Sequence, residues 1–583
     1  MNMNLPNIVK TYKNSSFFVD PQKELCIGME LGNSDCKIGI VNQNTSEIQL
    51  VCFDDDKYSM PTLVSFSQNK KEIKIGYEAE KDLINNPSQT IFNIVKYFGV
   101  KYNDIKCRNN LWPFKIFYTN DEENRPYIKI DFGPQKDKIF YFENIIAIFL
   151  EKLFELIFNK VNLENKYNYS EDKIKKEDQE EYNNLIALNI ILVLTVPNYF
   201  SYSQRKLIEN IIKVQIFPEI NDSDIKIYDK YKINLVRLKI ENASSIGALC
   251  LLKNYDYNNL QEKNLLILNI DGGSANISIT SSKNENEKII YQVKSIKSLQ
   301  KGEVDLVDDF MFEILQKFET NIKREILDSP LCLVKLRKIC QKIKENLIIK
   351  KNDSFNIVEI LENYDEKIEI TREEYENSIC NIFNNIKVLI LEALKDAEIN
   401  EKDINDIIFI GQICREKKFH EIIEQLFISS IYEELIYSNY LDTEKDFYNV
   451  GGAAYHALNS INNNIYLFFD ICPFDLGIMN YHGELNLIIK KGEKIPILKE
   501  KILKVKNENS LKIYEKIENE NINKLIGTIE LDNINNDIEN FKYGFRELKI
   551  KFEVNDEIEI FISIFNNDEG KYKNKQKVNL LLV

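Results

Sequence analysis

Residues 265–280, LLILNIDGGSANISIT, decide the fold of this chain. The apolar run 265–270 is too short for a helix, and it ends at the sequence DGG, which is typical of a turn. After the turn, Ile277 and Ile279 alternate with polar residues, as in a strand with one buried face. The stretch therefore predicts a β-hairpin whose turn exposes backbone amides.

The turn of this hairpin suits an anion. The adjacent glycines Gly272 and Gly273 let main-chain N–H groups approach an anion closely, and Ser274 adds a hydroxyl donor. A phosphate is the usual occupant of such a turn, although an ordinary tight hairpin has the same pattern.

The pattern recurs elsewhere in the chain. Residues 25–40, LCIGMELGNSDCKIGI, repeat it with Glu30, Gly32 and Ser34 at the turn. Residues 407–415, IIFIGQICR, form a third strand followed by a glycine. Self-similar phosphate hairpins far apart in the sequence indicate a duplicated nucleotide-binding fold.

Composition excludes several classes of protein. The 583 residues suffice for several domains, and 44% hydrophobic with 29% charged residues is typical of a globular chain. The net charge of -15 argues against direct nucleic-acid binding, and no apolar run reaches the ~18 residues of a membrane helix.

Ten scattered cysteines without a C-x-x-C pair and three scattered histidines predict no metal site. Residues 1–24 lack the features of a secretory or transit peptide, so we expect a cytoplasmic protein.

Strands alternate with helices up to about residue 460, which indicates an α/β architecture. A charged run at about 160–183 is interpreted as an insertion. From residue 465 short alternating runs predict an all-β domain of about a hundred residues. At the junction, 465–470, IYLFFD, is either the first strand of that domain or a segment that docks reversibly. Helices are expected at 86–99 after an initial turn, at 145–158, from a cap at Ser203, and at 305–318, 332–348, 372–396 and 419–427.

These stretches together resemble the seventy-kilodalton heat-shock chaperones, the DnaK family, from about Leu25 onward. The resemblance implies an actin-like two-lobed nucleotide-binding domain over 25–460, after a leader of residues 1–24, then a linker at 461–470 and a β-sandwich over 471–583. We expect this sandwich to lack the family's helical lid. The segments that carry the resemblance are IGMELGNSDCKIGIV, IGYEAEKDLINNPSQTIFNIVKYFG, LTVPNYFSYSQR, NIDGGSANISI, DAEINEKDINDIIFIGQICREKKF and IYLFFDICPFDLGI.

The positions that serve hydrolysis in the family differ here. Glu30 replaces an aspartate, Val95 falls on the catalytic lysine, and Asn269 and Asn276 fall on two aspartates. Asparagine can neither carry the charge that orders hydrated Mg²⁺ nor act as a general base, and valine cannot neutralise a developing phosphoryl charge. We expect ATP to be bound but hydrolysed slowly or not at all, with the need for Mg²⁺ open. Lys96 is the alternative catalytic lysine.

The nucleotide-binding positions are better matched. Lys344 and Arg415 match the pair that sandwiches adenine, and Glu303 matches a ribose contact. Gln412 stands where the family has its second glycine, which predicts a narrower pocket. The residues carried over as nucleotide-binding are Gly32, Asn33, Ser34, Gly272, Gly273, Ser274, Glu303, Lys344, Gly411 and Arg415.

Positions that couple the domains are also matched. Pro197 and Arg205 match the family's proline switch and arginine relay, and Glu241 matches an interlobe glutamate. Arg237 and Asp470 match positions where J-domain proteins dock.

A lidless, non-hydrolysing chain is similar to the Ssz-type branch of the family. That branch implies a regulatory or structural partner of a zuotin-like J-domain protein, at the ribosome and near nascent chains. Two alternatives stay open: an active ATP-driven chaperone that uses Glu30 and Lys96, and a nucleotide-exchange partner of an ordinary family member.

Overall fold

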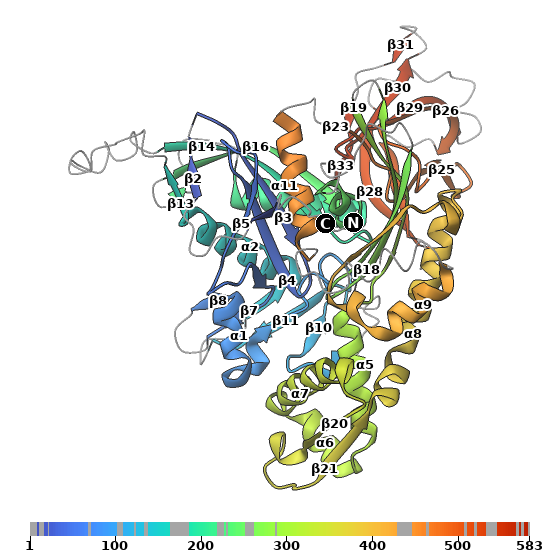
Figure 1. Cartoon of the computed structure of the whole chain (residues 1–583). Coiled ribbons are helices and arrows are strands. Elements are labelled where there is room, and N and C mark those ends of the chain that lie inside the picture. The colour runs from blue at the N-terminus through green and yellow to red at the C-terminus, as the bar shows by residue number, and fades with distance from the viewer. Residues whose placement is uncertain are drawn as a thin grey trace, which may run out of the picture.

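A computed structural model of the chain shows the arrangement of its elements (Figure 1). The expected insertion lies outside the described residues from position 164 onward, as does most of the expected leader. The described residues are 9–10, 17–20, 22–67, 72–101, 109–121, 124–132, 138–163, 186–218, 227–228, 231–250, 262–285, 288–427, 446–461, 466–506, 510–517, 522–531, 545–566, 571–572 and 576–580.

The first lobe is built on a mixed sheet. Its centre is the antiparallel hairpin of β3 (Leu25–Leu31) and β4 (Asp35–Val41). Parallel to β3 runs β14 (Ile186–Val196), and parallel to β14 runs β16 (Tyr231–Asn242). Every residue of β3 is buried, which explains its nearly continuous apolar sequence. The flanking strands are β1 (Val9–Lys10), β5 (Ile48–Leu50), β6 (Ser59–Pro61) and β15 (Ile227–Tyr228).

The second lobe repeats this plan. The hairpin of β17 (Lys263–Ile270) and β18 (Ala275–Glu285) lies between β22 (Asp406–Ile410), which is parallel to β17, and β19 (Lys288–Leu299). The predicted duplicated hairpins are therefore confirmed.

Helix α11 (Tyr448–Ile461) packs on the first hairpin at very short range. A Cβ atom on Gly28 of β3 would lie 2.2 Å from the backbone nitrogen of Ala454. A Cβ on Gly452 would lie 2.1 Å from the carbonyl oxygen of Ile246, in helix α4 (Ala243–Gly247). Glycine at these two positions lets the helix backbone approach, and α11 thereby fixes the base of the cleft between the lobes.

Most of the predicted helices are confirmed, and the prediction for 372–396 has the observed bounds. Amphipathic periodicity identified them, since each covers one face of a sheet or of another helix. Their bounds are α1 (Gly76–Asn85), α2 (Phe142–Phe158), α3 (Tyr202–Asn210), α5 (Glu303–Gln316), α6 (Thr320–Asp328), α7 (Pro330–Ile349), α8 (Arg372–Asp396) and α9 (Lys417–Leu426). Smaller sheets join β7 (Val64–Phe66) with β8 (Ile73–Ile75), β10 (Ile116–Tyr118) with β11 (Pro126–Ile130) and β12 (Lys138–Tyr141), β2 (Phe17–Val19) with β13 (Val161–Leu163), and β20 (Asn352–Asn356) with β21 (Lys367–Thr371).

The prediction of a helix within 86–99 is wrong. The segment forms a 3-10 turn, Pro87–Gln89, the short strand β9 (Thr90–Ile91) paired with β7, and further turns. Asn93 has a φ of 57°, in the left-handed region that a helix cannot use.

The predicted start of α3 at Ser203 is also wrong, by two residues. Ser201 is the N-cap, and its side chain accepts a hydrogen bond from the backbone of Gln204, whose own side chain returns to the Ser201 nitrogen.

The predicted all-β region forms two sheets that share one apolar core. That core contains Leu476, Ile513, Ile550 and Phe552. One sheet holds β25 (Leu485–Ile489), β24 (Asp475–Met479), β27 (Ser510–Ile517), β28 (Ile522–Glu530) and β33 (Asn579–Leu580); the other holds β26 (Ile497–Lys506), β29 (Phe545–Val554), β30 (Ile560–Asn566), β31 (Lys571–Tyr572) and β32 (Gln576–Lys577).

The apolar junction belongs to the second lobe and not to the sandwich. Its described part forms strand β23 (Tyr466–Phe469), which pairs in parallel with β19 at the edge of the second sheet. The ring of Phe468 stacks on Tyr291, with ring centroids 5.8 Å apart. The ammonium of Lys494, in the sandwich, lies 3.7 Å from the centroid of the Phe469 ring of β23, so this segment is the docked junction of the two domains (Figure 1).

Candidate functional site

The first hairpin places a charged pair at the base of the cleft. Glu30 and Lys37 are cross-strand partners, and both side chains are buried. The Lys37 ammonium lies 3.1 Å from one carboxylate oxygen of Glu30 and 3.4 Å from Asp35. Asn449 of α11 donates to the other Glu30 oxygen at 2.6 Å. Glu30 is thus held by the protein at both oxygens.

A third carboxylate, from the second hairpin, completes this cluster. Asp271 is close enough to act electrostatically on both Lys37 and Glu30. Burial raises the pKa of Glu30 and Asp271 above the ordinary carboxyl value. Burial alone would lower the pKa of the Lys37 ammonium, but the surrounding carboxylates outweigh it and raise that pKa well above its usual value. The ammonium therefore stays charged.

In the second hairpin, Asn276 has a structural role. Its side-chain oxygen accepts from the backbone nitrogen of Asn198 at 3.0 Å, and its amide nitrogen donates to the Ser274 hydroxyl at 2.9 Å. Asn269 is its cross-strand partner and is fully buried. Neither amide can act as a general base, as the sequence predicts.

The turns of the two hairpins touch one another. A Cβ on Gly272 would lie 1.8 Å from the Ser34 hydroxyl oxygen, and one on Gly273 would lie 2.7 Å from the Cβ of Asn33. The cavity between the turns, lined also by Glu30, has a volume of about 10 Å³. That space holds about one water molecule. A triphosphate does not fit between the turns in this arrangement.

The cluster also does not fit a divalent metal. Magnesium requires free oxygen ligands, whereas Glu30 is already bound by Lys37 and Asn449. Within the described ranges, no group of three or more His, Cys, Asp or Glu residues is placed to hold a metal ion.

Val95, at the position that the resemblance assigns to the catalytic lysine, is completely buried in the apolar core. The neighbouring Lys96 turns away to the second lobe, where its ammonium lies 2.6 Å from Asp305. Asp305 also accepts from the backbone nitrogen of Gly302 at the start of α5. Lys96 thus forms a buried interlobe ion pair.

The side chain of Asn33 ties the first turn to the segment before Lys96. Its oxygen accepts from the Lys96 backbone nitrogen at 3.0 Å, and its amide donates to Asn93 at 2.7 Å. The second turn is tied to α5, because the carbonyls of Asp271 and Gly272 accept from the first two backbone nitrogens of that helix. Both turns are therefore fixed by protein contacts.

The expected adenosine contacts are engaged with acidic side chains. Lys344, buried on α7, pairs with Glu303, and Arg415 lies 2.6 Å from Asp446. Each cation that was predicted to face adenine thus has a carboxylate partner.

Gly411, the one glycine kept at this loop, is required by the backbone. It has a φ of 95°, and a Cβ would lie 2.1 Å from the carbonyl oxygen of Ile270. Gln412 follows it directly and begins a short 3-10 turn, Gln412–Arg415.

The predicted coupling residues do converge, at the seam between α3 and the sandwich. The Arg205 guanidinium donates to the Phe200 carbonyl at 3.0 Å and to Asn242 at 2.5 Å, and Asn242 donates to Asp470 at 3.2 Å. Pro197 begins this loop, since its carbonyl accepts from the Phe200 nitrogen.

The sandwich binds the same loop directly. Glu515 of β27 accepts from the backbone nitrogen of Tyr202, whose ring meets Phe474 edge to face at 5.5 Å. Burial raises the pKa of Asp470 and of Glu515 to about 7. Glu241 lies 3.6 Å from the His456 ring. Because burial lowers the pKa of His456, the imidazole is neutral and the contact is not an ion pair.

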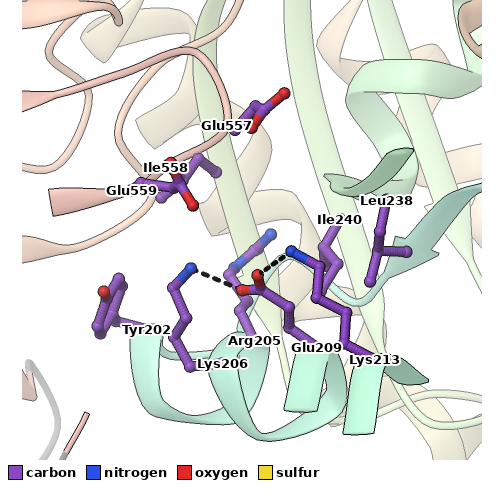
Figure 2. A pocket seen from close by; sticks show the side chains of 10 residues that line it. All are labelled: Tyr202, Arg205, Lys206, Glu209, Lys213, Leu238, Ile240, Glu557, Ile558 and Glu559. Carbon is purple, nitrogen blue, oxygen red and sulfur yellow. Dashed lines mark hydrogen bonds and ion pairs between the residues drawn. The ribbon is translucent and has the colours of Figure 1, made fainter. Parts of the chain in front are cut away.

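Figure 2 shows the outer part of the seam, a cavity of about 30 Å³. Lys206 and Lys213 of the α3 region both bind Glu209, at 2.6 and 2.7 Å, and Glu557 and Glu559 of the sandwich line the opposite side. Basic and acidic groups thus face each other across the two domains.

The two predicted J-domain docking residues differ in exposure. Arg237 is exposed and donates to the Ser460 carbonyl at the end of α11. Asp470 is buried, so a partner could reach it only if the domains separated.

Sequence reasoning missed the chemistry of Lys37 and Asp271. A lone lysine inside the apolar strand DCKIGIV was the available signal for Lys37. The partner of Lys96, Asp305, is 209 positions away, and no local pattern could identify it.

Within the part of the chain that the structure describes, every helix is too short or too polar to span a bilayer.

Comparison with known proteins identifies one family over most of the chain. The family model described as "Hsp70 protein" matches residues 26–165 and 238–579. Heat shock cognate 70 kDa protein 3 of Dictyostelium discoideum is 24% identical over 500 residues, which cover 84% of this chain and 70% of that relative. A heat shock 70 kDa protein of Neurospora crassa is 23% identical over 502 residues, covering 84% of this chain and 68% of the relative.

Proposed function

Since this chain belongs to the Hsp70 family, we propose that it is a member that does not turn over ATP and that acts as a regulatory, structural partner of a J-domain protein. Members of this family bind ATP, work as chaperones and cooperate with J-domain proteins. The proposal concerns which of these properties this chain uses.

The proposal rests on the side chains that occupy the family's catalytic positions in this chain. Asn276 holds a backbone nitrogen, Asn269 is buried, and Val95 lies in the apolar core. No base faces the turns at these positions, and no cation is available there to neutralise a transferred phosphoryl group. Losing one such contact costs about 3 kcal/mol of barrier, so losing all of them makes turnover negligible.

The geometry speaks against Lys96 as a substitute. Its ammonium is buried and bound to both oxygens of Asp305 at 2.6 Å. Releasing it would leave a buried carboxylate without its cation, which is strongly unfavourable. The active-chaperone alternative is therefore disfavoured.

Support for a J-domain partner comes from the surface beside the linker. Arg237 is exposed on β16 and donates to the Ser460 carbonyl at the end of α11, and Val236 next to it is 48% exposed. From the resemblance to the Ssz-type branch, we extend the proposal to a zuotin-like partner near nascent chains. Cosedimentation of the reconstituted pair with ribosomes tests that extension.

Single-turnover hydrolysis is the test of the central proposal. The full chain is mixed with Mg²⁺ and labelled ATP, with and without a purified J-domain, beside the Dictyostelium relative as a positive control. We expect no phosphate release above buffer in either case. Release at the rate of the relative would overturn the proposal.

Partnership is tested separately by titrating the J-domain into the chain. We expect binding that Arg237→Ala weakens at least tenfold, while Arg324→Ala, an exposed arginine on α6, leaves it unchanged. Equal binding by both variants would remove Arg237 from the docking surface.

A further inference from the structure

We propose that Lys37 and Asp271 take the place of a metal-bound phosphate in the cleft, so that the chain holds its lobes and its sandwich together without nucleotide. The sequence led us to expect bound ATP, and this proposal replaces that expectation. It also goes beyond the absence of hydrolysis, because it concerns what fills the site.

The charges support this assignment. A cleft that binds metal and phosphate brings a cation and an anion between the two hairpins. Here the hairpins supply both themselves: an ammonium from β4 and a carboxylate from the second turn, beside Glu30 and Asp35. A triphosphate would have to compete for that ammonium with Glu30 and Asp35, which already bind it.

The narrow space between the two hairpin turns also supports the proposal. The Ser34 hydroxyl and the Gly272 backbone are in direct contact, and about 10 Å³ remains beside them. The lobes would have to move apart before a nucleotide could enter.

A continuous set of bonds leads from this cleft to the seam. Asn276 of the second hairpin holds the backbone of Asn198, one residue after Pro197. The loop that follows carries Tyr202 to Glu515 and presents its Phe200 carbonyl to Arg205. The closed cleft thus fixes the loop in the position to which the sandwich binds.

The lone tryptophan provides a direct readout of closure. Trp112, in the first lobe, donates from its indole nitrogen to Asp308 of α5 at 3.0 Å and is 4% exposed. Its emission should shift to longer wavelength if the lobes separate, because the indole would then meet water.

Titration of Mg·ATP into the full chain tests the proposal, by calorimetry and by Trp112 emission. For the wild type we expect no binding up to millimolar nucleotide and blue-shifted emission throughout. Asp271→Gly removes the carboxylate from the turn, and we expect it to bind Mg·ATP at least tenfold more tightly than the wild type. Asp56→Gly is the matched control, since it makes the same change of charge on the exposed loop after β5 and should bind no ATP.

Micromolar binding by the wild type would overturn the proposal and leave the absence of hydrolysis untouched. Equal affinity of Asp271→Gly and wild type would also overturn it. Lys37→Met gives a second measure, with circular dichroism as the check on folding. We expect a red shift of Trp112 emission in the folded variant, and unchanged emission would contradict the role of the ammonium.

Discussion

The cleft and the seam are both lined by buried polar groups, yet they differ in what those groups reach. In the cleft, Lys37, Glu30 and Asn276 bond to neighbours within the nucleotide-binding domain. In the seam, Glu515 reaches across to the other domain, and the Arg205 network leads to Asp470 at the junction. The cleft lacks the acidic side chains and the lysine that the resemblance assigns to turnover, whereas the seam binds the two domains to each other. Under the proposed function, the joined arrangement of the two domains is the working state of the chain.

The largest effect is expected for Arg205→Ala, which tests whether the seam stabilises the joined domains. The variant loses two hydrogen bonds and the guanidinium that acts electrostatically on both Asp470 and Glu515, so we expect a loss of about 3–5 kcal/mol of unfolding free energy. Urea denaturation of the full chain measures it. Arg237→Ala, on the surface, should stay within about 0.5 kcal/mol. Equal losses of unfolding free energy in the two variants would show that Arg205 does not stabilise the seam.

Lys96→Met tests whether the cleft is structural. Its removal leaves Asp305 buried without a partner, so we expect a loss of about 3 kcal/mol, again by urea denaturation. Lys317→Met, which breaks the more exposed pair with Glu374, should cost at most about 1 kcal/mol. A large loss of ATP turnover in Lys96→Met, with stability unchanged, would instead favour the active chaperone.

The pH dependence of docking provides a further test of the seam. Docking raises the pKa of Asp470 and Glu515 from about 4 to about 7, so the docked state binds more protons. Its stability is complete below the undocked pKa and is lost as the pH rises through 7. Between pH 7.5 and 5.5 we expect docking to strengthen by on the order of 4 kcal/mol. The facing groups are Arg205, Glu241 and Lys524.

The measurement is resistance of the domain junction to a protease active over this pH range, corrected for cleavage of an unstructured peptide. Glu515→Gln should flatten the profile, since one of the two titrating groups is gone. An unchanged profile in that variant would assign the pH dependence elsewhere.

The smallest effect concerns the helix that carries the seam residues. Ser201→Ala removes the N-cap of α3 and should cost about 1 kcal/mol. Ser203→Ala, two residues on, should be near neutral. The opposite order would mean that the helix begins where the sequence pattern predicted.

The sequence predicted the elements whose pattern is local. The hairpins at 25–40 and 265–280 follow from alternation around glycine turns, and 372–396 follows from helical periodicity. The segment 86–99 failed because Asn93 adopts a left-handed conformation that composition does not reveal.

From the sequence, only the loss of the family's catalytic side chains could be predicted at the site. Missing acids and a missing lysine could be read at Asn269, Asn276 and Val95. What replaces them could not, because Asp271 acts electrostatically on Lys37, and Lys96 pairs with Asp305, between segments that are distant in the sequence. Long-range charge pairs leave no periodic trace in a single sequence.

The pairing of β23 with β19 has a consequence for solubility. The junction is the outermost strand of the second sheet, so undocking it would uncover the backbone N–H and C=O groups along β19. An uncovered edge of this kind pairs readily with strands of other chains. By keeping its own junction in that place, the protein protects its second sheet against aggregation.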